Sequence, residues 1–147
     1  MRISFDLDHT LILHGTVSRK DSDGKLLGGD ILRKGTISLL KELSVSNELW
    51  VYTTSFRKQW FVLLGFWLKG IKIARVINEN DHRKLIRNYD FDIQPSKYPV
   101  HYGIDVHVDD SIGVLQEGDL FGFKVIQVNP DDLNWVETIK QKLHHLS

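Results

Sequence analysis

The feature that most constrains the fold of this chain is an alternation of short apolar runs with longer helical patterns along its 147 residues. The apolar runs predict buried strands at residues 3–5, 49–52, 71–77, 104–108 and 122–128. Strands that alternate with helices predict a parallel sheet covered on both faces. The expected fold class is therefore α/β, a Rossmann-like three-layer sandwich with a central parallel sheet of about five strands.

Polar side chains directly follow three of these strands. Asp6 and Asp8 follow the first strand, Thr53 the second, and Asp109 and Asp110 the fourth. The carboxyl ends of parallel strands lie at one edge of the sheet, so these groups predict a single site. Asp6 and Asp8 are two residues apart, which places both carboxylates on the same side of extended backbone, where their charges repel. Oxygen-only ligands favour a hard cation such as Mg²⁺ at this position.

The segments between the strands also have readable patterns. Residues 14–30 are polar and rich in glycine, which predicts a small flap or hairpin that turns at Asp23-Gly24. We expect Thr36 to cap the helix that follows the flap. Residues 78–88 are polar and form a loop or a short helix, and Asn129 to Asp132 cap a terminal helix.

One predicted helix, at residues 56–69, is apolar on nearly all faces. Its stretch from Trp60 to Leu68 is the longest apolar run of the chain, and it is too short to cross a bilayer. The pattern has two interpretations. The helix is buried all round, or half of it meets another copy of the chain in a homo-oligomer.

Composition excludes several classes of function. The 19 basic and 19 acidic residues cancel, so no global charge attracts nucleic acid. Because there is no cysteine, a disulfide framework, a thiol nucleophile and a thiolate zinc site are impossible. The opening residues lack the apolar core of a signal peptide, so we expect a cytoplasmic protein without a membrane partner. The length fits one domain over residues 1–147.

The ordered polar residues resemble the motifs of the haloacid dehalogenase (HAD) superfamily. Asp6-Leu7-Asp8-His9-Thr10 resembles the first motif, an acidic pair in the pattern Asp-x-Asp-x-Thr at the end of the first strand. Thr53 resembles the second motif, Lys97 the third, and Asp109-Asp110 the fourth. The resemblance covers essentially the whole chain, and the ordered set is more specific than one acidic pair. No segment is long enough for a large cap, so the chain is similar to the capless members.

The resemblance implies a magnesium-dependent phosphatase that works through an aspartyl-phosphate intermediate. Asp6 would attack phosphorus. Asp8 would protonate the leaving oxygen and then, as its conjugate base, activate the hydrolytic water. Thr53 would donate a hydrogen bond to the transferring group, and Lys97 would offset the charge on that group and on Asp6.

The resemblance also implies the metal ligands. Asp6, the backbone carbonyl of Asp8, and Asp109 would hold Mg²⁺, while Asp110 would act directly or through water. Cations are needed here because a carboxylate cannot approach an anionic phosphate unless both charges are screened.

Several alternatives stay open at this point. The spacing from Lys97 to Asp109 is short for many family members, so Lys84 and Arg83 are rivals for the cationic role. The phosphorylated substrate is a small molecule or a macromolecule, and the flap either contacts it or does not. The alternative function is a non-catalytic phosphate- or partner-binding module. A phosphorylated signalling receiver is disfavoured, because receivers carry the phosphorylated Asp on a later strand.

Overall fold

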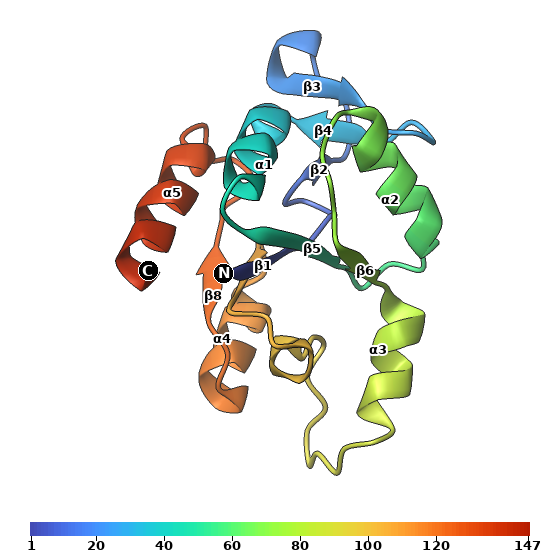
Figure 1. The fold of residues 1–147 in the computed structure, drawn as a ribbon, viewed down its shortest axis with the longest axis vertical. Helices are drawn as coiled ribbons and strands as arrows, with labels where there is room; N and C mark the ends of the chain where they lie inside the picture. Colours follow the sequence, from blue (N-terminus) through green and yellow to red (C-terminus); the bar gives the residue numbers. More distant parts are fainter.

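The computed structural model describes residues 1–147, and its centre is a parallel sheet of five strands in the order β6-β5-β1-β7-β8 (Figure 1). The strands are β1 (Arg2–Phe5), β5 (Glu48–Tyr52), β6 (Arg75–Ile77), β7 (Val106–Asp109) and β8 (Val125–Gln127). In the register of the ladder, Phe5 of β1 lies between Val51 of β5 and Val108 of β7. The predicted α/β class and strand number are confirmed. The third and fifth strands are shorter than predicted.

Helices cover both faces of this sheet. They are α1 (Thr36–Ser44), α2 (Gln59–Leu68), α3 (Glu79–Ile86), α4 (Ile112–Phe121) and α5 (Trp135–Leu146). In Figure 1, α1, α2 and α5 lie on one side of the sheet and α3 and α4 lie on the other. The larger hydrophobic core cluster joins the sheet to the first group, through residues such as Leu40, Phe66 and Ile139. The three central strands, β5, β1 and β7, are therefore buried on both faces over most of their length.

The flap forms a small antiparallel sheet in the order β2-β4-β3, and it contains a hairpin, β3-β4, whose turn is not at the predicted position. Its strands are β2 (Ile12–Leu13), β3 (Ser22–Lys25) and β4 (Ile31–Arg33), with a short 3₁₀ helix at Arg19–Asp21. Asp23-Gly24 lies inside β3, so the predicted turn there is wrong. The chain reverses instead at Gly28 and Gly29, which both have φ of 94° and can adopt this conformation because they lack Cβ atoms.

The predicted cap of the first helix is also wrong. Gly35 occupies the N-cap position with φ of 93°, and Thr36 is the first helical residue. The Thr36 hydroxyl is buried and has no hydrogen-bond partner. The backbone N–H of Ile37 donates instead to Asp23 Oδ2 at 2.9 Å. A flap carboxylate therefore caps the helix, which no local pattern around Thr36 encodes.

The terminal helix begins later than predicted. Its N-cap is Asn134, whose side chain makes no capping bond. The two carbonyl oxygens of Asn129 and Asp132 instead accept hydrogen bonds from Arg33 Nη2 at 2.9 and 2.8 Å. Arg33 therefore holds the loop that precedes the helix, and the helix starts at Trp135.

The apolar helix is α2, and it is not buried all round. Val62, Gly65 and Phe66 are buried, whereas Trp60 and Trp67 are 60% and 67% exposed. The first interpretation of this helix is therefore wrong. No helix of the structure is both long and apolar enough to cross a membrane.

Candidate active site

The candidate site begins where β1 ends. The backbone N–H of Asp6 donates to the carbonyl oxygen of Val108 at 2.9 Å, so the neighbouring strand β7 holds Asp6 in place. A tight turn follows, in which the Leu7 carbonyl oxygen accepts backbone hydrogen bonds from Thr10 and Leu11 at 3.1 and 2.9 Å. His9 adopts φ of 63° in this turn. The turn reverses the chain immediately after the carboxylate and carries Asp8 and Thr10 beside it.

Lys97 lies at the centre of the acidic cluster. Its Nζ is 2.9 Å from Asp6 Oδ1 and 2.5 Å from Asp109 Oδ2, and the side chain is 2% exposed. Burial opposes a charged lysine, but the two carboxylates raise the pKa of Lys97 above its usual value. Lys97 is therefore an ammonium ion that bridges two strand ends.

His107 also belongs to the site, although the sequence motifs did not predict it. Its Nε2 is 2.8 Å from Asp109 Oδ2, and its Nδ1 is 2.7 Å from Ser4 Oγ. A carboxylate only accepts, so Nε2 carries the proton and Nδ1 accepts from Ser4. Burial and the Lys97 charge lower the pKa of His107, which keeps the ring neutral. The available signal was its position two residues before Asp109 on the same strand, which puts both side chains on one side.

The two buried acids have different environments. Burial, together with the Asp109 charge, raises the pKa of Asp6 to about 6 despite the nearby Lys97. Burial opposes ionisation of Asp109 too, but hydrogen bonds from His107 and Lys97 and the Lys97 charge hold the pKa of Asp109 below its usual value. Asp109 is therefore ionised at neutral pH. The positive charge near Asp6, in contrast, does not offset the effect of its burial.

The acidic residues can hold a metal ion. Asp6, Asp109 and Asp110 each offer an oxygen, and these oxygens lie within 4.8 Å of one another. Thr10 Oγ1 lies between two of them, 3.3 Å from Asp6 Oδ2 and 3.2 Å from Asp110 Oδ1. The cluster contains three carboxylates but only one ammonium, that of Lys97, and its possible metal ligands are all hard oxygens. Both observations fit a divalent cation of the Mg²⁺ kind.

Asp8 points away from this cluster. Arg57 donates to both of its oxygens, from Nη1 to Oδ2 and from Nη2 to Oδ1, each at 2.9 Å. His14 Nε2 lies 2.7 Å from Asp8 Oδ1. Hydrogen bonds from Arg57 lower the pKa of Asp8 to about 2, although burial opposes the shift. Only the backbone carbonyl of Asp8, not its carboxylate, is thus left for a metal. Arg57 was not predicted as a site residue.

Thr53 follows β5, the strand beside β1. Its hydroxyl donates to Ser55 Oγ at 3.0 Å and accepts the backbone N–H of Ser55 at 3.1 Å. Ser55 Oγ in turn accepts from Arg57 Nη1 at 3.0 Å. A continuous chain of hydrogen bonds therefore links Thr53, through Ser55 and Arg57, to Asp8.

The structure separates the candidates for the cationic role. Arg83 Nε donates to Glu79 Oε1 at 3.2 Å on the surface of α3, and Lys84 makes no ion pair. Lys97 alone of the three contacts Asp6. The short space between Lys97 and Asp109 holds a 3₁₀ helix at Pro99–Tyr102 instead of an α-helix.

Comparison with known protein structures identifies the fold. No family model matches the sequence, and no curated protein matches it. Among solved structures, a protein described as a predicted HAD-like family hydrolase from Porphyromonas gingivalis superposes with a TM-score of 0.52 at 13% identity. The match covers 97% of each chain. The chain has a HAD-like fold. The HAD-like sheet places the carboxyl ends of β1, β5 and β7 side by side, and no cap-sized domain is added to it.

Proposed function

We propose that this protein is a magnesium-dependent phosphatase that hydrolyses phosphate monoesters through an aspartyl-phosphate on Asp6. The observation that carries the proposal is the convergence of Asp6, Lys97, Asp109 and Asp110 at the carboxyl ends of adjacent strands. In this proposal, Asp6 attacks phosphorus as the bond to the ester oxygen breaks. Water then attacks the aspartyl-phosphate, releases phosphate and restores the carboxylate.

Each neighbour has a role in the proposal. Lys97 holds Asp6 and screens its charge as the anionic phosphoryl group approaches, and Thr53 donates to a phosphoryl oxygen. Magnesium, held by Asp6, Asp109, Asp110 and the Asp8 carbonyl, would supply further screening of charge. His107 keeps Asp109 ionised and oriented.

Asp8 would protonate the leaving oxygen and then activate water. A carboxyl with a pKa of about 2 is ionised near neutral pH, so the ion pair with Arg57 has to open before Asp8 can carry a proton. We assign the opening to substrate binding, because a phosphoryl group beside Asp8 competes for the Arg57 guanidinium.

The test is phosphate release from p-nitrophenyl phosphate with and without Mg²⁺. Asp6→Asn should lose at least about a thousand-fold in kcat, because the amide is a poor nucleophile. Mass spectrometry of acid-quenched wild type should find a phosphoryl group on Asp6. Asp119→Asn, which removes an exposed carboxylate from α4, is the matched control and should keep full activity. Wild-type turnover by Asp6→Asn would refute the mechanism.

A second candidate function is a non-catalytic phosphate- or partner-binding module. The observation that favours it is the ion pairing of both Asp8 oxygens, which removes the acid/base group from the cluster. This alternative predicts that Mg²⁺ raises the melting temperature while no ester in a broad panel is hydrolysed.

A further inference from the structure

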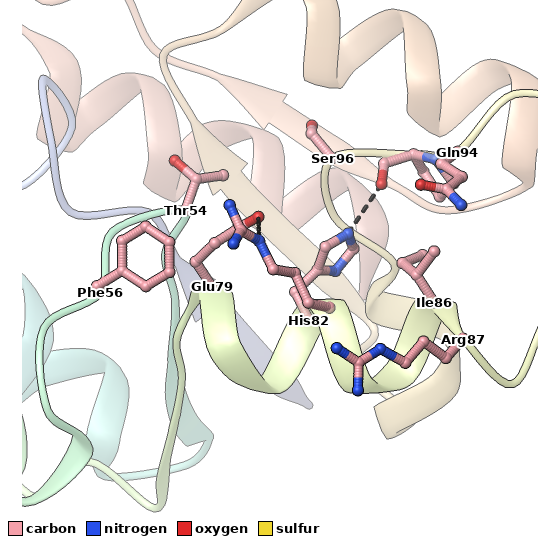
Figure 2. A pocket seen from close by; sticks show the side chains of 10 residues that line it. Thr54, Phe56, Glu79, His82, Ile86, Arg87, Gln94 and Ser96 are labelled. Carbon is pink, nitrogen blue, oxygen red and sulfur yellow. Dashed lines mark hydrogen bonds and ion pairs between the residues drawn. The ribbon is translucent and has the colours of Figure 1, made fainter.

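A cavity of about 580 Å³ lies between α3 and the loop that carries Lys97 (Figure 2). Its wall includes Thr54, which directly follows Thr53, and Ser96, which directly precedes Lys97. Consecutive Cα atoms are about 3.8 Å apart, so the backbone at Thr54 and Ser96 is close to that of Thr53 and Lys97. The cavity therefore lies beside the two segments that carry Thr53 and Lys97.

One face of α3 and the residue after it line this cavity. The lining positions are Glu79, His82, Arg83, Ile86 and Arg87, whose spacing of three and four residues is that of a single helix face. The opposite face lines a separate hollow of about 610 Å³, through Asp81, Lys84, Leu85 and Asn88. Arg87 and Lys84 are thus exposed cations near the same helix end that face different hollows.

The cavity has a positive charge that is not offset. Only two of its ten lining residues are hydrophobic, so it suits a polar group. Arg83 pairs with Glu79 at 3.2 Å, and its guanidinium lies 4.9 Å from the centre of the Phe56 ring. Arg87 makes no ion pair. Its guanidinium is left to bind an anion from outside the chain.

The inner wall of the cavity is held rigidly. His82 Nε2 donates to the Pro95 carbonyl oxygen at 2.9 Å, and His82 Nδ1 accepts from Tyr52 Oη at 2.6 Å. Ser96 donates to Glu117 from its backbone N–H at 3.1 Å and from its hydroxyl at 2.8 Å. A preformed wall lowers the entropy that binding would otherwise cost.

We infer that this cavity binds the leaving group of the substrate, and that the leaving group carries an anionic group of its own that pairs with Arg87. The inference rests on the proposed function and narrows it to phosphate monoesters that bear a second negative charge, a carboxylate or another phosphate. Arg87 is then a specificity-determining residue. Arg83 and Phe56 form the side of the cavity against which the leaving group lies.

The experiment compares alkyl phosphates that end in a hydroxyl, a carboxylate or a second phosphate, over a series of linker lengths. Phosphate release gives kcat and KM for each ester. At the linker length that reaches Arg87, the anionic ester should have a KM about tenfold below that of the hydroxyl ester, with similar kcat, because a charge-assisted hydrogen bond forms on binding. The carboxylate and phosphate series identify which anion is preferred.

Arg87→Glu should abolish this preference, and Arg87→Gln should reduce it while placing no acid at the helix end. Lys84→Glu is the matched control, since it makes the same charge change on the other face, and it should keep the preference. Hydrolysis of p-nitrophenyl phosphate should be unaffected in Lys84→Glu, because Lys84 lines the other hollow.

The outcomes separate the two hypotheses. If no ester is hydrolysed, p-nitrophenyl phosphate included, the proposed function fails and this inference fails with it. If p-nitrophenyl phosphate is hydrolysed but anionic and hydroxyl esters have equal KM at every length, the inference alone is overturned. Equal loss of preference in Lys84→Glu and Arg87→Glu would also overturn it, because a general charge effect would then explain the data.

Discussion

Lys97 reaches the acidic cluster from a loop without regular secondary structure, and three elements hold that loop. His82 of α3 binds the Pro95 carbonyl, Glu117 of α4 binds Ser96, and the hydroxyl of Tyr52 in β5 accepts the backbone N–H of Tyr98 at 3.0 Å. The ammonium position is therefore set by contacts on both sides of Lys97. At the scale of single residues, the Lys97 ammonium and the contacts that hold its loop set the charge balance of the site.

Lys97→Gln should lower the stability of the protein and increase the stabilisation that magnesium provides. Removing the ammonium leaves Asp6 and Asp109 buried without their cation, which costs about 3–5 kcal/mol, or roughly 10 °C in Tm. Mg²⁺ should therefore raise the Tm of Lys97→Gln by more than it raises the Tm of wild type. Thermal unfolding with and without Mg²⁺ measures both effects. Lys84→Gln is the control, and an equal Mg²⁺ effect in all three proteins would contradict the prediction.

His82 should make stability depend on pH. Burial lowers the pKa of His82 below its ordinary value of 6.5, and its ring accepts from Tyr52 only when Nδ1 is unprotonated. As pH falls below about 6.5, the unfolded chain takes up the proton first, so the contribution of His82 is present above that pH and is lost below it.

The measurement is Tm of wild type and of His82→Gln between about pH 7.5 and 5.5. Wild type should lose more Tm over this range than His82→Gln. The raised pKa of Asp6 acts in the opposite direction, but it is present in both proteins and cancels in the difference. His144→Gln, at the exposed end of α5, serves as the control. Parallel pH curves for wild type and His82→Gln would contradict the prediction.

At the scale of elements, α1 depends on the flap. The carboxylate of Asp23 in β3 satisfies an N–H group of the first turn that has no partner within the helix. Arg57, just before α2, pairs with Asp30 at 3.1 Å as well as with Asp8. The flap is thus joined to the first turn of α1 and to the segment that precedes α2.

Asp23→Ala should destabilise the protein by about 1 kcal/mol, the usual loss for an N-cap. Thr36→Val should be neutral or stabilising, because the Thr36 hydroxyl is buried without a partner and valine has the same shape. Urea denaturation measures both variants. The reverse order, with Thr36→Val the more damaging, would mean that Thr36 caps the helix after all.

At the scale of the whole molecule, α2 leaves apolar side chains on the surface. Trp60, Leu64, Trp67 and Leu68 are exposed on this helix, next to exposed Phe56. Contiguous apolar surface of this kind usually marks an interaction site. The remaining interpretation of the apolar helix is therefore that it meets another copy of the chain.

We predict that the protein self-associates through α2. Light scattering after gel filtration should give a mass above that of one chain, which is 17.0 kDa. Trp67→Glu should return the protein to monomers, because a charge in an apolar interface is costly. Leu133→Glu, at a residue that is 91% exposed outside α2, should leave the mass unchanged. A monomeric wild type at high concentration would refute the prediction.

The local sequence determined the strands, their parallel arrangement and the polar residues that follow them. These features depend on apolar periodicity within a few residues, and β1, β5 and β7 have it clearly. The predicted α/β class followed from this alternation and is confirmed by the sheet. The residues Asp6, Asp109 and Asp110 could be named for the same reason, although their catalytic roles stay predictions.

Only the tertiary structure decided which side chains meet. Lys97 contacts Asp6 across 91 positions of sequence, and the cap of α1 comes from a carboxylate 14 residues from the N–H that it binds. Arg57, 49 positions from Asp8, takes both of its oxygens. Such pairs depend on how distant segments pack, which a local pattern does not encode. For the same reason, the pattern of α2 could not show which of its apolar residues the sheet would leave exposed.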